Sequence, residues 1–214
     1  MTRTGGRLLP LVVLVVAGLL LVASIAWVAT GRMSGQAGPG QWGPGHMGGP
    51  GYSAGPVEDL DGAQRAANGF AERWDLGVGE VMEFDDGFYA VLTEPDGSGA
   101  TEVVIDPRSG AVRIEWGPAM MWNTAYGPHR FDAPEGTALG EDQARAIADE
   151  WLADHRSGEQ TAEVVAFPGY YTIHTEDASG RTAGMLSVHA DTGDVWYHTW
   201  HGRFIASTGH ETDE

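Results

Sequence analysis

The chain has 214 residues, no cysteine, and 30 aspartates and glutamates against 12 basic residues, which gives a formal net charge of −18. The missing cysteines exclude disulfide bonds, thiol catalysis, cysteine-ligated zinc and lipid attachment through a cysteine. A strongly negative protein repels phosphate backbones, so we expect no nucleic-acid partner.

A long apolar segment lies near the start of the chain. Residues 8–30, LLPLVVLVVAGLLLVASIAWVAT, carry no charge and follow a short N-terminus, residues 1–7, with two arginines. A helix of this length extends roughly 35 Å, enough to cross a hydrocarbon core of about 30 Å. The excess of arginines before the segment favours a cytoplasmic N-terminus. The sequence therefore predicts a single-pass anchor in the cell membrane with the remainder outside the cytoplasm, or a secreted protein if cleavage occurs near Ala26.

A segment rich in glycine and proline follows the predicted anchor. Residues 31–56 contain ten glycines, four prolines and no acidic residue. Such a composition cannot bury enough apolar surface to offset the entropy of ordering, so we expect a flexible tether.

The remaining residues contain two similar helical patterns. AQRAANGFAERW, residues 63–74, aligns with ARAIADEWLADH, residues 144–155. Apolar residues recur in both at the i, i+3, i+4, i+7 spacing of an amphipathic helix. Each segment is therefore predicted to be a helix with one buried face.

Similar strand patterns follow each predicted helix. GFYAVLTE, residues 87–94, matches GYYTIHTE, residues 169–176, and VVIDPRSGAV, residues 103–112, matches LSVHADTGDV, residues 186–195. The last two segments contain glycine turns between alternating strands, which is typical of hairpins. Each repeat is thus predicted to be one helix followed by a three- or four-stranded antiparallel meander.

The fold class expected from this repeat is α+β, with two tandem helix-plus-sheet units behind one transmembrane helix. The first unit is assigned to residues 57–116 and the second to residues 137–205. Residues 117–136 are the connector between them, and residues 206–214 form an acidic tail.

The repeated pattern of an alanine-rich helix, a G-Y/F-Y strand and a strand that closes in S/T-G-x-V resembles the PepSY family. The resemblance implies a non-enzymatic module outside the cytoplasm. PepSY relatives occur in propeptides of thermolysin-type metallopeptidases and in membrane-anchored proteins for which peptidase inhibition or regulation has been suggested. No H-E-x-x-H zinc motif occurs in this chain. We therefore expect a non-catalytic protein without a cofactor, which binds a protein partner and regulates or inhibits a separate peptidase.

Comparison of the two repeats separates positions that match, which packing explains, from positions that differ, where a function of one repeat could reside. The pairs Phe70/Trp151, Tyr89/Tyr171 and Val91/Ile173 are apolar in both repeats and are explained by packing. In the second sheet, strand alternation assigns Tyr171 and Ile173 to the side that faces the helix. The opposite face of the second sheet then receives residues that differ from the first repeat: Tyr170, His174, His189, Trp196, His198 and Trp200.

Three of these residues, His174, His189 and His198, suggest an alternative function. Histidines on neighbouring strands lie close enough to share zinc or copper, which would make the chain a metal-binding envelope protein. The first repeat has Leu92, Asp106 and Glu115 at the matching positions. Three ordinary strand histidines remain the other interpretation, because a one-residue change of register would separate them.

The tryptophans on this face carry a further implication. Trp196 and Trp200 would be exposed on an open sheet, so we expect the other repeat, the connector or a partner protein to cover them.

The connector begins with GPAMMWNTAYGPHRF, residues 117–131, and permits three interpretations. Methionine fills irregular apolar gaps, aromatic and methionine side chains also bind proteins, and Met120, Met121 and His129 could ligate copper. We expect Met120, Met121 and Trp122 to wedge between the two sheets. The predicted partner-binding residues are Met120, Met121, Trp122, Asn123, Tyr126, Trp196 and Trp200, and the hypothetical metal ligands are His174, His189, His198 and His129.

Overall fold

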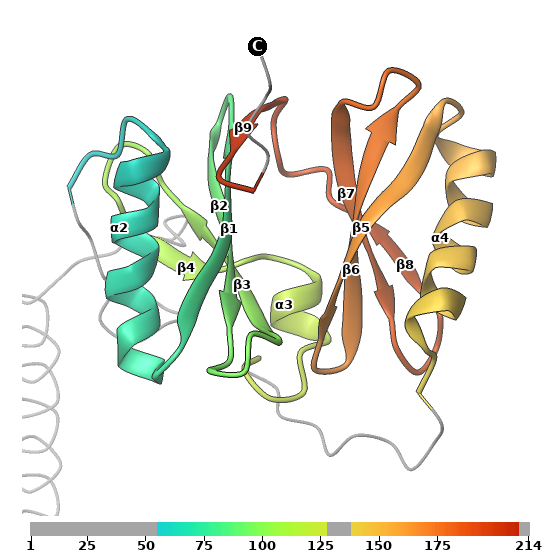
Figure 1. The fold of residues 1–214 in the computed structure, drawn as a ribbon, viewed down its shortest axis with the longest axis horizontal. Coiled ribbons are helices and arrows are strands. Elements are labelled where there is room, and N and C mark those ends of the chain that lie inside the picture. Colours follow the sequence, from blue (N-terminus) through green and yellow to red (C-terminus); the bar gives the residue numbers. More distant parts are fainter. Residues whose placement is uncertain (1–54, 128–137, 210–214) are drawn as a thin grey trace, which may run out of the picture. The chain divides into compact units, whose positions relative to one another are not determined.

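The computed structural model of the protein describes residues 55–127 and 138–209. These residues form an α+β fold with two antiparallel sheets and few helices, which confirms the expected fold class at this level (Figure 1). The predicted membrane span, the linker and His129 lie outside the described residues. Within the described ranges, no helix combines the length and apolarity needed to cross a bilayer.

The first repeat consists of one helix and a four-stranded meander. Its elements are α2 (Leu60–Ala71), the 3-10 turn η2 (Glu72–Trp74), β1 (Gly77–Phe84), β2 (Gly87–Thr93), β3 (Gly99–Ile105) and β4 (Val112–Ile114). Asp59 caps α2 by accepting a 2.7 Å hydrogen bond from the backbone N–H of Gly62. The predicted apolar stripe of α2 is buried against the sheet at Ala63, Ala66, Ala67 and Phe70.

The second repeat has the same order of elements. They are α4 (Glu141–His155), β5 (Glu159–Phe167), β6 (Tyr170–Asp177), β7 (Thr182–His189) and β8 (Val195–Tyr197). Helix α4 buries Ala144, Ala148 and Leu152 against Ile173 and Leu186 of its sheet. Figure 1 shows α2 against one sheet and α4 against the other, and each helix covers a single face of its own sheet.

The β1–β2 and β5–β6 hairpins differ by one residue in the position of the glycine that aligned them in the sequence. Gly87 lies in β2 and pairs with Phe84, whereas Gly169 lies in the turn, so that the strand begins at Tyr170, which pairs with Phe167. A shift of one residue turns every side chain to the opposite face.

Tyr89 and Val91 are buried, as expected of packing positions, but they do not face the helix. They point away from α2, where Phe88, Ala90 and Leu92 take the helix-facing positions instead. In the second repeat, the expectation that Tyr171 and Ile173 face the helix is correct, because both pack toward α4. The residue of the first repeat that corresponds to His174 is thus Val91 and not Leu92.

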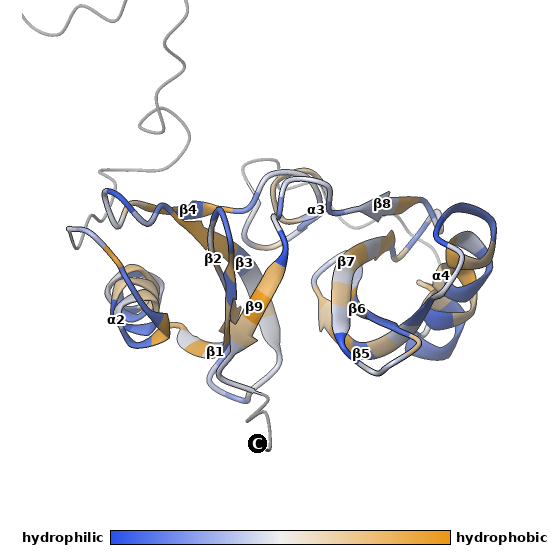
Figure 2. Cartoon of the chain, turned by 90° about the horizontal axis from the view of Figure 1, so that it is seen from above, coloured by the Kyte–Doolittle hydropathy of each residue, from blue (hydrophilic) through white to orange (hydrophobic). Residues whose placement is uncertain are grey.

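The chain returns to the first sheet near its end. Strand β9 (Phe204–Ser207) is hydrophobic (Figure 2) and pairs antiparallel with β1, which gives the sheet order β4-β3-β2-β1-β9. The sequence pattern predicted no strand here and divided these residues between the second repeat and the tail. This pairing instead ties the end of the second repeat to the first repeat.

The faces that the helices leave open share one hydrophobic cluster. It contains Met82, Phe84, Tyr89 and Val91 of the first sheet and Phe167, Tyr170 and Met185 of the second. The connector adds a short helix, α3 (Pro118–Met121), and both Ala119 and Trp122 pack into this cluster. Met120 is buried, but Met121 is 50% exposed, so the expected wedge does not include Met121.

Gly169 of the second repeat lies close to the connector. Its φ is +93°, and a Cβ atom there would lie 2.3 Å from the backbone oxygen of Trp122. We expect Gly169→Ala to lower the free energy of unfolding by about 2–4 kcal/mol, because backbone strain and a steric clash add. Urea unfolding followed by tryptophan fluorescence measures this loss.

Gly180→Ala is the matched control for this substitution. Gly180 also has a positive φ, +78°, but a Cβ atom there meets nothing within 4 Å among the described residues. Its cost is expected to stay near 1 kcal/mol, from backbone strain alone. Equal losses in the two variants would contradict the close contact between Gly169 and the connector.

Candidate functional site

The predicted face of the second sheet does lie opposite its helix, but the three histidines do not converge. His174 places Nε2 3.8 Å from a carboxylate oxygen of Glu80. His189 accepts backbone hydrogen bonds in the turn after β7 and contacts the edge of the Trp122 ring. His198 instead meets Glu115 of the first repeat, with 3.1 Å between Nδ1 and Oε1. The hypothesis of one metal site shared by these three histidines is therefore not supported by their placement.

A buried carboxylate, Glu102 on β3, lies between the two repeats. The hydroxyl of Tyr89, in the first sheet, donates to Oε1 over 2.5 Å, and that of Tyr170, in the second sheet, donates to Oε2 over 2.7 Å. All three side chains are fully buried. The pair of tyrosines therefore gives each carboxylate oxygen one donor, as a buried polar group requires.

A second buried carboxylate, Glu115, follows β4 and is contacted by side chains of the segment after β8. Its Oε1 lies 3.1 Å from Nε1 of Trp200, 3.0 Å from Nε2 of His201 and 3.1 Å from Nδ1 of His198. The other nitrogen of His198, Nε2, lies 2.9 Å from the hydroxyl of Ser187. One carboxylate of the first repeat is thus surrounded by three aromatic side chains from beyond the second sheet.

The two carboxylates have opposite electrostatic character. Burial, and next the negative charge of Glu115, raise the pKa of Glu102 to about 7. Burial also disfavours ionisation of Glu115, but interactions with His198 and then His201 outweigh it and lower the pKa of Glu115 to about 2. The paired environments therefore keep Glu115 ionised and favour the protonated form of Glu102.

The neighbouring tyrosines stay protonated. Burial is the largest cause that raises the pKa of both Tyr89 and Tyr170 well above its ordinary value, and the charge of Glu102 adds to it. Both hydroxyls therefore keep the proton that they donate to Glu102.

Above these buried groups lies a surface of tryptophans and methionine. Trp116, Met121 and Trp196 are 52%, 50% and 38% exposed. The rings of Trp122 and Trp200 lie 5.7 Å and 6.1 Å from that of Trp196, and Trp116 and Trp200 line the same hollow. We call these five residues the tryptophan surface.

The connector residues Asn123 and Tyr126 hold the connector in place. The Asn123 amide donates to the backbone oxygen of Ala100 over 2.8 Å, and its Oδ1 accepts from the backbone N–H groups of Ala125 and Tyr126. Tyr126 donates its hydroxyl to Glu94. Asn123 is buried, so it presents nothing to a partner in this structure.

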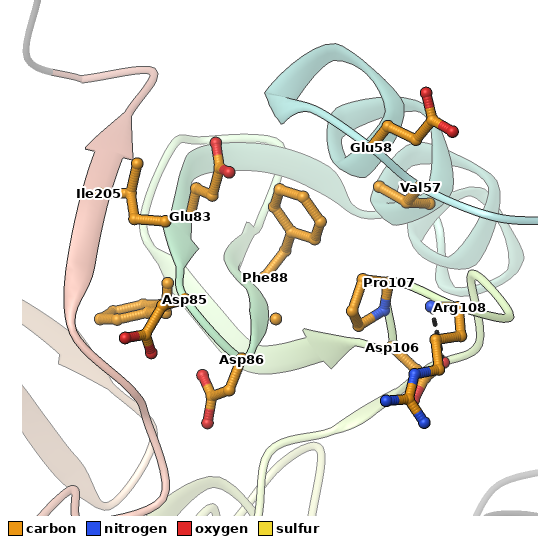
Figure 3. A pocket seen from close by; sticks show the side chains of 12 residues that line it. Val57, Glu58, Glu83, Asp85, Asp86, Phe88, Asp106, Pro107, Arg108 and Ile205 are labelled. Carbon is orange, nitrogen blue, oxygen red and sulfur yellow. Dashed lines mark hydrogen bonds between the residues drawn. The ribbon is translucent and has the colours of Figure 1, made fainter.

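A separate acidic hollow lies beside β9 (Figure 3). Its carboxylates include Asp85, Asp86 and Asp106. Asp106 accepts backbone hydrogen bonds within its own turn, while Asp85 and Asp86 accept those of Arg203 and Gly202. These carboxylates thus shape a turn and fix the approach to β9, which explains their presence without a ligand.

Sequence reasoning missed Glu102 and His201 entirely and treated Glu115 only as the counterpart of His198. A signal for Glu115 was present, because the equivalent positions of the two repeats carry a carboxylate and an imidazole. No local pattern pointed to Glu102, whose donors come from two different sheets.

Comparison with known proteins gives little further information. No family model and no curated protein matches the sequence. Among solved structures, the chain is similar to the C-terminal domain of YpeB from Bacillus megaterium, with 16% identity and a TM-score of 0.26. The match covers 67% of this chain and 63% of that one, so the chain spans less than two thirds of the length of that structure. A likeness at this level does not establish a family, and the resemblance to PepSY remains a prediction from the sequence.

Proposed function

We propose that the chain is a non-catalytic PepSY-like protein, anchored in the membrane through residues 8–30, which binds a protein partner outside the cytoplasm and regulates or inhibits a peptidase. The observation that carries this proposal is the tryptophan surface. Exposed tryptophan and methionine are costly in a soluble surface and are enriched where proteins bind each other.

The construction of the tryptophan surface supports a role in recognition. Trp200 donates to the buried Glu115, and the ring of Trp200 stacks on that of His198 at 4.5 Å. Trp196, whose ring lies 6.1 Å from that of Trp200, therefore rests on a side chain that is already fixed. Pre-organised aromatic anchors lose little conformational entropy on binding, which is characteristic of interface hot spots.

The charge of the chain indicates the kind of partner. Thirty acidic residues against 12 basic ones produce a negative field that favours encounter with a basic protein surface. The partner that we propose is therefore a protein with basic residues around an apolar pocket that accepts tryptophan.

The buried carboxylates favour a binding protein over an enzyme. Both oxygens of Glu102 accept from tyrosines, and Oε1 of Glu115 faces three aromatic side chains, so protein groups surround these three oxygens. A general acid or base has to reach its substrate directly or through one water. Such enclosed groups are better suited to joining the two repeats.

The proposal can be tested by photo-crosslinking in native membranes. A photoreactive residue at Trp116 or Met121 of the full chain is expected to capture one defined protein, whereas the same residue at Ile205, which is also 50% exposed, is not. Once that protein is identified, Trp116→Ala is expected to weaken its binding about tenfold or more, and Ile205→Ala to leave it within about twofold.

The proposed regulation of a peptidase is tested separately, by measuring peptidase turnover. The full chain should change the turnover of the captured protein if this is a peptidase, or of the peptidase associated with it, and Trp116→Ala should reduce that change in parallel with binding. Equal crosslinking at Trp116 and Ile205 would contradict the docking surface. A specific partner without any effect on proteolysis would contradict the regulatory role only.

A further inference from the structure

The buried Glu115 and the two histidines beside it have the arrangement of metal ligands. Oε1 of Glu115 lies 3.0 Å from Nε2 of His201 and 3.1 Å from Nδ1 of His198, and one ligand atom from each residue falls within 4.8 Å of the others. Ligands about 2.0 Å from a tetrahedral zinc ion are separated from each other by roughly 3.3 Å. Small shifts of these side chains would therefore admit an ion between them.

The surroundings of His198 prepare one of its nitrogens for such a role. Nε2 lies 2.9 Å from the hydroxyl of Ser187, which in turn lies 2.9 Å from that of Thr172. A hydrogen bond at Nε2 fixes the ring and leaves the lone pair on Nδ1, the nitrogen that faces Glu115. Second-shell partners of this kind orient histidine ligands in metal sites.

Two atoms of the cluster lack the partners that burial demands. Among the described residues, neither Oε2 of Glu115 nor Nδ1 of His198 has a hydrogen-bond partner, and both side chains are fully buried. An unsatisfied buried polar atom costs free energy, and most such atoms in native proteins have a partner or an explanation. A cation bound by the carboxylate and this nitrogen would satisfy both atoms.

We propose that Glu115, His198 and His201 bind one divalent transition-metal ion, for which Zn²⁺ is the best match. Two imidazoles and one carboxylate form a known zinc donor set, and they leave the fourth tetrahedral position for a further ligand. His201 lies at the edge of the cluster and also lines a hollow with Trp116 and Trp200, which provides a route for the ion. The ion would join the first repeat, through Glu115, to the segment that follows the second.

This assignment differs from the other group of potential ligands in the described part of the chain. That group consists of Glu80, Glu163 and His174. Glu163 is exposed, and the contact between His174 and Glu80 is a loose 3.8 Å. Exposed acidic residues near a histidine are common without a metal, so His174 serves as the internal control.

The test is calorimetric titration of the full chain in detergent, stripped with a chelator, with ZnCl2 as the only added ion. The wild-type chain should bind zinc at one site with roughly micromolar or tighter affinity. His201→Gln should weaken that affinity about 100-fold or more, while His174→Gln and His155→Gln should leave it unchanged. Glutamine can still donate to Glu115, so His201→Gln removes the ligand and retains the hydrogen bond.

A second measurement separates metal binding from folding. Without zinc, His201→Gln should have the near-ultraviolet circular dichroism of the wild type. With zinc, the Tm of the wild type should rise and that of His201→Gln should not, because only a folded state that binds the ion gains stability. Affinity that is only millimolar in the wild type, or equal affinity in His201→Gln, would overturn the proposal.

Discussion

Glu115→Ala, measured in the presence of a chelator, is expected to lower the free energy of unfolding by about 3–5 kcal/mol. The substitution leaves the indole N–H of Trp200 without its acceptor and removes the carboxylate beside the buried His198. It also opens a cavity at a side chain that has no exposed area. Removal of one partner of a buried charge network costs more than the network contributes as a whole, because the remaining groups stay buried and unpaired.

Urea unfolding at constant pH measures this loss, and Glu150→Ala provides the control. Glu150 lies on the exposed side of α4, so its removal should change the free energy of unfolding by no more than about 0.5 kcal/mol. A loss below about 1 kcal/mol for Glu115→Ala would mean that the cluster does not hold the two repeats together.

The order of helices and strands could be predicted because it depends on the local spacing of apolar residues along the sequence. The stripe Ala63, Ala66, Ala67 and Phe70 has the spacing of a helix, and it is buried as expected. The glycine turns between β3 and β4 and between β7 and β8 lie where the sequence placed them. Both features depend on neighbours within one element or one hairpin.

The register of β2 could not be obtained from the sequence similarity of the two repeats. The segments GFYAVLTE and GYYTIHTE align without a gap, yet Gly87 belongs to a strand and Gly169 to a turn. The turn before β2 is made by Asp85 and Asp86, whereas Pro168 and Gly169 make the turn before β6. Because strand periodicity is two, this single difference exchanges the faces of Tyr89 and Tyr171.

The candidate site could not be predicted from the sequence for another reason. Its residues come into contact only when the two repeats pack together. Glu102 and Tyr170 are 68 positions apart, and Glu115 and His201 are 86 apart. Strand β9, which brings the end of the chain back to β1, is equally non-local. No periodicity within one element encodes such contacts, so a site built from them has to be found in three dimensions.

The raised pKa of Glu102 predicts that stability falls as the pH rises from about 4.5 to about 7. In the unfolded chain a glutamate releases its proton near 4.5, whereas folded Glu102 holds it to about 7. The folded state therefore binds more protons in this interval, and its contribution is complete below pH 4.5 and lost above pH 7. A difference of this size corresponds to about 3 kcal/mol. The lowered pKa of Glu115 acts only between about 2 and 4.5, where stability should rise with pH.

Glu102→Gln isolates this effect because it removes the titratable proton but keeps hydrogen bonds to both tyrosines. The amide oxygen can accept from one hydroxyl, and the NH2 group can donate to the other. Urea unfolding at pH 5 and at pH 8 should show a smaller decrease in the free energy of unfolding for Glu102→Gln than for the wild type, by about 3 kcal/mol at most. The control Glu150→Gln should keep the wild-type decrease. Identical decreases in all three proteins would mean that Glu102 is already ionised in the folded state at pH 5. The buried cluster would then hold two negative carboxylates at once, which its histidines would have to neutralise.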